Sequence, residues 1–409
     1  MSGTYLVRGA RQLLTLHGSA EPRRGAALQE LEIIRDGSLL IRDGRILEVG
    51  LTRRVENLAQ ARGSQEIDAT GRVVMPGFVD CHAHLVWPAP SLGDIKTGAS
   101  RTAQPSAANK LRSASAKRLA FRARPFVNGM AHHGTTTVGA ISGHGLDQRD
   151  ELKILRVQAK LDRSPLDIVS TFMAPPGVPD AYAADPGGYL AWLSAGLLPT
   201  IRQRTRVRFA GLDCGGAIFT IEQIRRYLET VRALGFQLKI HAGESPLDGA
   251  LRLAVELGAV SIDRLCGASA EDTRMLAASN TMAVLLPASG RCASARPLIE
   301  AGAAVALGSG FHPGFSSTYS MPSIVALACA NLCMTPAEAI CAATFNAACA
   351  LGSARVAGSL EVGKAADVIV WNASDYREIP YYLGVNRLHR ILKDGVTIYD
   401  EGQGAAYRI

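Results

Sequence analysis

The middle of the chain alternates short apolar runs with longer stretches in which apolar residues recur every three or four positions. The short runs predict buried strands, and the longer stretches predict amphipathic helices. Their alternation is typical of parallel strand–helix–strand units. The predicted strands cover residues 73–85, 135–141, 166–173, 207–212, 237–241, 260–265, 282–286 and 303–307, and the predicted helices include 221–234, 247–257 and 271–278.

Eight such units predict an α/β fold, a (β/α)8 TIM barrel over residues 73–355, whose functional residues lie at the C-terminal ends of its strands. Both ends of the chain instead show short β-type runs separated by turns. Asp43-Gly44 between two such runs is a strong hairpin signal. We therefore expect residues 1–72 and 356–409 to form one small β-sandwich domain beside the barrel.

His82 and His84 lie at the end of the first predicted barrel strand. Residues i and i+2 of a strand point to the same side, so both imidazoles should face one spot. Converging imidazoles indicate a metal site, although an isolated His-x-His pair also arises by coincidence on surface strands. The strongly apolar run before them argues against a surface strand and favours the metal.

His241 ends the fifth predicted strand, and Glu244 follows it. With His82 and His84, His241 would complete a three-histidine site that leaves one coordination position open for water. We expect one divalent cation there, with zinc preferred to iron or manganese. Glu244 could act as general base on the bound water or orient a ligand, and the alternative is a salt-bridged surface carboxylate.

The composition is that of a globular protein, with 409 residues, 47% of them hydrophobic and 20% charged. The start shows no signal-peptide pattern and no apolar run could span a bilayer, so we expect a cytoplasmic protein with no membrane partner. The eight cysteines lack a framework spacing and are expected to be reduced and buried, with Cys329 and Cys333 on one helix face.

The net charge of +8 raises the question of nucleic acid or an anionic substrate. The one dense basic patch, at residues 110–124, has no interleaved aromatic residues to stack on bases. A solvated helix face explains this patch better, so we expect a small-molecule substrate and no nucleic acid. The overlapping segment 91–117 would be a lid over the barrel or a solvated loop.

Several segments along the chain match motifs of one enzyme family: 76–84, 142–147, 239–244, 283–287, 320–322, 334–339, 358–367 and 380–386. On these segments the sequence resembles the imidazolonepropionase-like members of the amidohydrolase superfamily over nearly its whole length. The resemblance implies a barrel with a small β-sandwich from both termini, and a homodimer. It also implies a zinc or iron ion that activates water to open the ring of imidazolone-5-propionate.

The chain departs from the family pattern at positions that would take part in the chemistry. Ile262-Asp263-Arg264-Leu265 stands where the family has a strand-six histidine, and Gly310 stands where it has the strand-eight aspartate that ligates metal and shuttles protons. Further differences are His144 for a tyrosine, Ile141 for a lysine, Pro176 for a histidine and Gly215-Gly216 for an acidic pair. We therefore expect a substrate other than imidazolone-5-propionate.

Arg264 cannot ligate a metal because its guanidinium does not deprotonate. It either pairs with Glu244 or Asp263, or binds an anionic group of the substrate, or indicates that no metal is present. His312 and His144 are candidates for the missing ligand or base. For His312 the alternative is a loop histidine with a structural partner.

Two hypotheses follow. The first is a metal-dependent hydrolase of a cyclic amide or other non-peptide C–N bond, with His82, His84 and His241 as ligands and Glu244, His312 or His144 as proton carriers. The second is a non-catalytic amidohydrolase descendant that acts as a binding or assembly protein. The loss of the strand-eight carboxylate favours the second, and the convergent imidazoles favour the first because burying unpaired polar groups costs stability.

Overall fold

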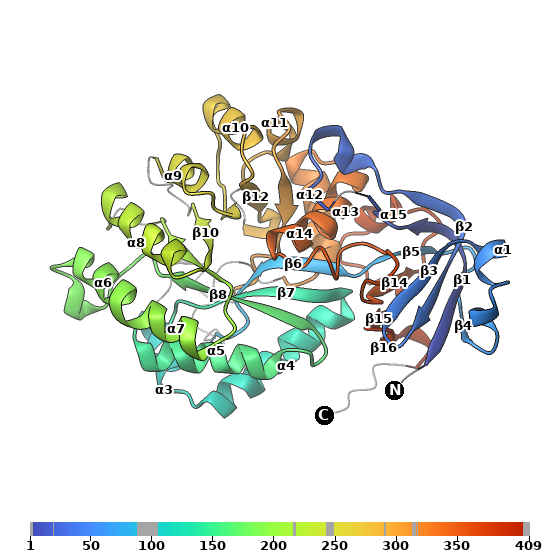
Figure 1. Ribbon diagram of the computed structural model, residues 1–409, viewed down its shortest axis with the longest axis horizontal. Coiled ribbons are helices and arrows are strands. Elements are labelled where there is room, and N and C mark those ends of the chain that lie inside the picture. Colours follow the sequence, from blue (N-terminus) through green and yellow to red (C-terminus); the bar gives the residue numbers. More distant parts are fainter. Residues whose placement is uncertain are drawn as a thin grey trace.

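A computed structural model of the chain describes residues 3–18, 20–87, 105–215, 218–242, 249–289, 292–312, 316 and 318–403, with the backbone alone at 105–108 and 403. It consists of a barrel and a separate sheet that lies to one side of it (Figure 1). In Figure 1 the sheet contains both the blue and the red ends of the chain.

The barrel is an eight-stranded parallel sheet in which the strands follow one another in chain order. It closes through two backbone hydrogen bonds, from Gly310 N to His82 O at 2.9 Å and from His84 N to Phe311 O at 2.7 Å. The predicted (β/α)8 barrel is therefore confirmed. Its strands are β6 (Phe78–Ala83), β7 (Thr135–Ile141), β8 (Asp167–Ala174), β9 (Phe209–Asp213), β10 (Gln237–His241), β11 (Ser261–Asp263), β12 (Met282–Leu285) and β13 (Val305–Leu307).

Amphipathic helices surround the barrel and bury their apolar faces against it. Three of them begin with reciprocal capping boxes, at Thr220, Ser269 and Thr335. Among the described residues, no helix combines the length and apolarity that a membrane span requires. The helices are α3 (Pro105–Ser113), α4 (Ala116–His132), α5 (Gln148–Leu161), α6 (Pro186–Trp192), α7 (Leu198–Arg204), α8 (Ile221–Ala233), α9 (Ala250–Glu256), α10 (Ala270–Ala277), α11 (Ala295–Glu300), α12 (Met321–Leu332), α13 (Pro336–Ala342) and α14 (Phe345–Ala350), with the short α1 (Thr52–Val55) and α15 (Glu378–Tyr381) near the terminal sheet.

The two ends of the chain form one mixed sheet, as expected for the small β-domain. The predicted hairpin at Asp43-Gly44 joins two of its strands. Apolar side chains from both ends of the chain share one buried cluster, which ties the termini together. The strands run in the order β16 (Val396–Asp400), β15 (Leu388–Lys393), β14 (Val368–Trp371), β5 (Val73–Pro76), β1 (Thr4–Leu14), β2 (Ile33–Arg42) and β3 (Arg45–Leu51), and β4 (Gln65–Asp68) also pairs with β1.

The prediction of a single strand over 73–85 is wrong, because this run forms two strands that belong to different sheets. β5 pairs with β1 and β14 in the terminal sheet, whereas β6 pairs with β7 in the barrel. Gly77 lies between them, and a Cβ atom there would come within 2.3 Å of the Thr136 side chain. The apolar pattern therefore reflects two cores, and only a glycine fits where the chain crosses from one to the other.

The prediction of a lid or loop over 91–117 is also wrong in part. Residues 91–104 lie outside the described residues, but the chain from Pro105 onward is helical, as α3 and the start of α4. Leu111 and Ala114 anchor this segment by packing into the core cluster beneath α4. Apolar residues at this spacing belong to a packed helical segment rather than to a solvated loop.

All eight cysteines are free thiols, as predicted. They are not all buried, however, since Cys333 is exposed. The expected shared helix face of Cys329 and Cys333 is absent because α12 ends at Leu332, and Cys333 caps the helix with a left-handed backbone at φ 57°. This C-cap geometry turns the chain away from the helix axis.

Candidate active site

Polar side chains face the inside of the barrel at the ends of three neighbouring strands. On β9, β10 and β11, the apolar residue before the last one packs into the core cluster between strands and helices. Because side chains alternate along a strand, the last residues, Asp213, His241 and Asp263, point into the barrel. The strand register pairs His241 with Asp213 on one side and with Asp263 on the other.

His82 joins two of these residues from the end of β6. One ligand atom from each of His82, His241 and Asp263 can be chosen so that all three lie within 4.8 Å of one another. His82 Nδ1 is 2.8 Å from Asp263 Oδ2, and His241 Nε2 is 4.0 Å from the same oxygen. All three are fully buried, and we call them the inner group. The described part of the chain holds one cluster of His, Cys, Asp or Glu with this spacing.

His84 lies beside the inner group but turns toward other histidines. Its Nδ1 is 2.9 Å from His144 Nε2, and its ring centre is 5.0 Å from that of His312. The Trp87 ring lies 4.2 Å from the rings of both His144 and His312. We call His84, His144 and His312 the outer histidine cluster. The structure thus brings together two of the three predicted ligands and places the third with two predicted proton carriers.

Carboxylates and cations alternate around the inner group. Lys239 Nζ is 3.8 Å from Asp263 Oδ2, and Arg264 Nη1 is 3.2 Å from Asp213 Oδ2. The same Asp213 oxygen lies 3.6 Å from His241 Nδ1. The sequence suggests Glu244 or Asp263 as a partner of Arg264. Among the described residues Arg264 pairs with Asp213, and Glu244 lies outside them, so that pairing stays a prediction. β11 ends directly before Arg264, whose left-handed backbone at φ 60° ends the strand earlier than predicted.

The protonation states of the inner group suit cation binding. Desolvation, together with the nearby His241, lowers the pKa of His82 to about 4, so its imidazole is neutral. Burial alone would raise the pKa of Asp263, but the Lys239 ammonium and the hydrogen bond from His82 bring it below its usual range. Asp263 is therefore ionised near neutral pH. Neutral imidazoles and a carboxylate are the forms that ligate a metal.

A divalent cation fits the donor atoms of the inner group. Two imidazole nitrogens and one carboxylate oxygen are a common ligand set for zinc. The His241 Nε2 atom is buried and has no hydrogen-bond partner among the described residues, which is costly unless a further group binds it. However, Lys239 and Arg264 already balance the charges of Asp263 and Asp213, and their positive charges would repel a cation.

Asp80 fixes the end of β6, a role that the sequence pattern above does not predict. It is fully buried and accepts hydrogen bonds from the backbone of His82 at 3.2 Å and of Ser309 at 2.9 Å, and from the Ser309 hydroxyl. Burial raises its pKa to about 6. The signal was available, since an aspartate inside a strongly apolar strand needs a buried partner.

Glu151, on α5, fixes the loop that carries His144. Its carboxylate accepts hydrogen bonds from the backbone N–H of Gly143, at 3.0 Å, and of Gly145. Burial raises the pKa of Glu151 to about 7. His144 is thus held in place by its two neighbours rather than by its own side chain alone.

Two further positions named from the sequence are Gly310, which the structure describes, and Glu244, which it does not. Gly310 has a left-handed backbone at φ 60°, and a Cβ atom there would lie 3.1 Å from Leu286 Cδ1. This position, where the resembling family has an aspartate, therefore resists any side chain. Glu244 lies outside the described residues, so its predicted role stays a prediction.

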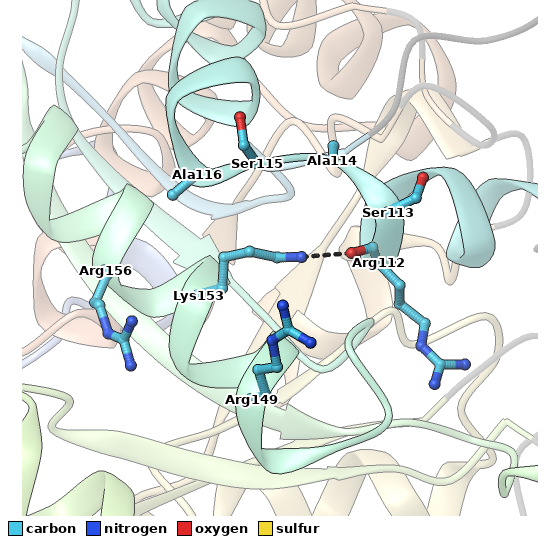
Figure 2. A pocket seen from close by; sticks show the side chains of 8 residues that line it. All are labelled: Arg112, Ser113, Ala114, Ser115, Ala116, Arg149, Lys153 and Arg156. Atoms are coloured by element: carbon cyan, nitrogen blue, oxygen red, sulfur yellow. Dashed lines mark hydrogen bonds between the residues drawn. The ribbon is translucent and has the colours of Figure 1, made fainter.

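A cavity lies on the outside of the barrel, between α5 and the junction of α3 with α4 (Figure 2). It has a volume of about 390 Å³ and four basic residues in its lining. Its Lys153 donates to the backbone oxygen of Arg112 at 2.7 Å and pairs with Asp150 at 2.7 Å. The lining residues are Arg112, Ser113, Ala114, Ser115, Ala116, Arg149, Lys153 and Arg156.

The sequence matches the amidohydrolase family over residues 73–398. The chain is 39% identical to an imidazolonepropionase from Geobacillus kaustophilus (strain HTA426), over 97% of this chain and 98% of that protein. It is 40% identical to an imidazolonepropionase from Symbiobacterium thermophilum, with the same coverage.

Solved structures of low sequence identity share the fold. A triazine hydrolase variant gives a TM-score of 0.71 at 17% identity, covering 97% of this chain and 95% of that one. An adenosine deaminase from Xanthomonas campestris with bound zinc gives a TM-score of 0.66 at 16% identity, covering 96% and 92%. Together with the family match and the imidazolonepropionase relatives, the barrel and its inward-facing site show that this chain belongs to the amidohydrolase family.

Proposed function

We propose that the protein is a metal-dependent hydrolase that cleaves a cyclic amide or another non-peptide C–N bond of a small molecule. The observation that carries this proposal is the inner group, in which His82, His241 and Asp263 converge inside the barrel at the C-terminal ends of its strands. This is the end at which barrel enzymes place their chemistry.

The inner group would hold one divalent cation, zinc before iron or manganese. A cation held there would polarise the carbonyl group of the substrate and lower the pKa of a water molecule. Asp263 orients His82 through its 2.8 Å contact, and Asp80 fixes the backbone of the same histidine. The ion pair with Asp213 holds Arg264 at the edge of the site, where its guanidinium can bind an anionic group of the substrate.

His144 and His312 are the proposed proton carriers. Desolvation lowers the pKa of His144 to about 3 and that of His312 well below its usual range. Both rings are therefore neutral near pH 7, which is the form that can accept a proton during hydrolysis. Glu244 is a further candidate for carrying a proton. His84 remains a candidate metal ligand if its ring turns from His144 toward His82.

The substrate proposed here differs from that of the named relatives. The Geobacillus and Symbiobacterium proteins are imidazolonepropionases. This chain carries Arg264, His144 and Gly310 at positions where the resembling family has other side chains, and these positions lie at or beside the site. A changed set of contacts at this end of the barrel favours a changed substrate.

A non-catalytic role is the second candidate function. It is favoured by the charge balance of the inner group, where Lys239 and Arg264 already neutralise Asp263 and Asp213. A binding or assembly protein needs no cation to complete such a site. The homodimer that the family resemblance implies would be its simplest assembly, and light scattering measures that mass.

Metal analysis and hydrolysis assays separate the two functions. Protein purified without chelator or affinity tag is analysed for zinc, iron and manganese, then tested on imidazolone-5-propionate and a panel of cyclic amides. We expect near-stoichiometric metal, hydrolysis of a panel member, and loss of both in His241→Ala. Metal far below stoichiometric together with no hydrolysis refutes the hydrolase, and His389→Gln on the terminal sheet serves as the control.

A further inference from the structure

The cavity between α5 and the junction of α3 with α4, which we call the basic cavity, is lined by cations from two sides (Figure 2). Three of its basic residues lie on α5 and one lies at the end of α3, and none of the described residues in its lining is acidic. Neither the inner group nor the outer histidine cluster contributes to this lining. The basic cavity is therefore separate from the candidate active site. Its basic residues are Arg112, Arg149, Lys153 and Arg156.

The three cations of α5 share one face of the helix. Arg149, Lys153 and Arg156 follow one another at intervals of four and three residues, the spacing at which helical side chains are neighbours. Like charges at this spacing repel one another and weaken a helix. The arrangement therefore favours binding of a negative charge between them.

Nearby carboxylates neutralise part of this charge. Asp150 pairs with Lys153 at 2.7 Å. Arg112 makes longer contacts, with Asp147 at 3.4 Å and with Asp150 at 3.5 Å, and its side chain is 43% exposed. Ion pairs of this kind contribute little, so a ligand can replace them at small cost.

The other two cations, Arg149 and Arg156, are exposed. Neither has an ion-pair or side-chain hydrogen-bond partner in the part of the chain that the structure describes. Two carboxylates thus accompany four cations, which leaves the basic cavity with a surplus of two positive charges.

The two walls of the basic cavity are tied together. Figure 2 shows Lys153 reaching from α5 toward α3, where its Nζ donates to the backbone oxygen of Arg112 at 2.7 Å. Leu111 and Ala114, on either side of that contact, pack into the core cluster beneath α4. The cavity is therefore already formed without a ligand, as small-molecule sites commonly are.

The start of α4 adds hydrogen-bond donors to the same wall. Ser115 caps the helix by accepting from Arg118 N at 3.2 Å. The backbone N–H of Ala116, at the first helical position, has no partner within the helix. The partial positive charge of a helix start supplements the full charges of the arginines.

We propose that the basic cavity binds a phosphate-bearing small molecule, which Arg112, Arg149 and Arg156 contact. A guanidinium group matches two phosphate oxygens with parallel N–H donors. A phosphate monoester carries roughly two negative charges near neutral pH, which equals the surplus of the cavity. The volume of about 390 Å³ suits a small molecule, and the lining holds no aromatic side chain to stack on the bases of a nucleic acid.

The test measures the binding of phosphate probes to the full-length protein at low ionic strength. Inorganic phosphate, pyrophosphate and adenosine monophosphate are titrated separately by calorimetry, and we expect at least one of them to bind with one molecule per chain. Arg149→Gln combined with Arg156→Gln should weaken this binding about tenfold or more, because hydrogen bonds to charged groups are lost. Both positions are exposed and glutamine is a good helix former, so the fold should persist, which urea unfolding checks.

Two further double variants separate a built site from general attraction to a basic protein. Arg225→Gln combined with Arg226→Gln removes two positive charges from α8, where each arginine pairs with a carboxylate, and it should bind the probe as the wild type does. Arg149→Lys combined with Arg156→Lys keeps the charge but loses the planar fork, and it should bind more weakly than the wild type.

The outcomes do not depend on the hydrolase proposed above. Tighter binding of adenosine monophosphate than of inorganic phosphate identifies an organic phosphate as the ligand, and the reverse identifies free phosphate. The proposal is refuted if no probe binds saturably, if the α8 variant loses as much affinity, or if the lysine variant binds as well as the wild type. It is also refuted by an oligonucleotide that binds more tightly than every probe, and by probe binding that is lost in Arg264→Gln instead, since that would place the probe inside the barrel.

Discussion

The inner group and the outer histidine cluster lie next to each other, with the rings of His82 and His84 centred 5.6 Å apart, yet they are held in different ways. The inner group lies on barrel strands whose register sets its geometry, and charged neighbours pair with its carboxylates. The outer cluster lies on segments after the strands and is held by ring contacts. Strand register thus sets the geometry of the inner group, whereas that of the outer cluster depends on three segments that follow strands.

The largest effect is expected from Asp263→Ala, which disrupts the inner group and leaves the outer cluster in place. Asp263→Ala removes the partner of both His82 and Lys239, and leaving a buried charge unpaired costs about 3–5 kcal/mol of unfolding free energy. Hydrolysis should be lost together with the inner metal. Urea unfolding measures the stability change, and metal analysis measures the loss of the inner ion.

Two variants control this prediction. Lys239→Met combined with Asp263→Ala should cost less than the sum of the single changes, because the ammonium no longer lacks its partner. Glu222→Ala removes an exposed carboxylate that pairs with Arg226, and it should cost at most about 0.5 kcal/mol. An Asp263→Ala cost as small as that of Glu222→Ala would contradict the proposed role of the buried carboxylate.

The next effect acts on the outer cluster through Glu151. Burial raises the pKa of this carboxyl from 4.5 to about 7, so the folded protein binds its proton more tightly than the unfolded chain does. Its contribution to stability is therefore largest below about pH 4.5 and falls by about 3 kcal/mol as the pH rises through 7. Glu151→Gln should abolish this part of the pH dependence, measured by urea unfolding across that range.

The same variant tests whether the loop of His144 depends on Glu151. The amide of glutamine offers one acceptor oxygen for two backbone donors, so one of them loses its partner. We expect a lower kcat, because His144 is a proposed proton carrier, and an unchanged metal content at the inner group. Glu222→Gln, at an exposed site, should change neither, and an unaltered pH profile in Glu151→Gln would contradict the argument.

The fold was predictable because its signals repeat. Each barrel strand is a separate apolar run, and eight of them in succession identify the barrel even where single boundaries are wrong. The failure at 73–85 has a physical reason, since two strands in different sheets give one continuous apolar run when only Gly77 separates them. Similarly, the left-handed backbone that shortens the sixth strand at Arg264 leaves no mark on hydropathy.

The site was predictable only as far as strands position it. His82 and His241 were predictable because strand ends meet at one face of a barrel, and the same argument extended by one residue reaches Asp213. Asp263 lies inside the predicted strand 260–265, where only its place opposite His241 marks it as a site residue. The rotation of His84 toward His144 depends on a side-chain torsion, which no sequence pattern encodes. The pairing of Arg264 with Asp213 likewise depends on register between neighbouring strands.

A smaller effect is expected at the hydrogen bond between Ser309 and Asp80, which supports the end of β6 and so both the inner group and the outer cluster. Ser309→Ala removes the hydroxyl that donates to Asp80, and a buried acceptor without its donor costs about 1–3 kcal/mol. Because Asp80 fixes the backbone of His82, two residues before His84, kcat should also fall. Ser316→Ala removes an equally buried hydroxyl that bonds to Ser309 O at 3.0 Å, and it should lower stability without lowering kcat as much.

The smallest expected effect concerns the position between the two regions, Gly310, whose N–H bonds to His82 O at 2.9 Å. Gly310→Ala places a Cβ on a left-handed backbone and 3.1 Å from Leu286 Cδ1, and we expect a loss of about 1 kcal/mol. Gly63→Ala is the matched control, since Gly63 has a similar φ of 75° but no atom within 4 Å of its Cβ position. The excess cost at Gly310, measured by urea unfolding, isolates the contact with Leu286. If the two variants lose equal stability, the backbone alone excludes a side chain there, and packing against the barrel wall plays no part in the loss of the strand-eight carboxylate.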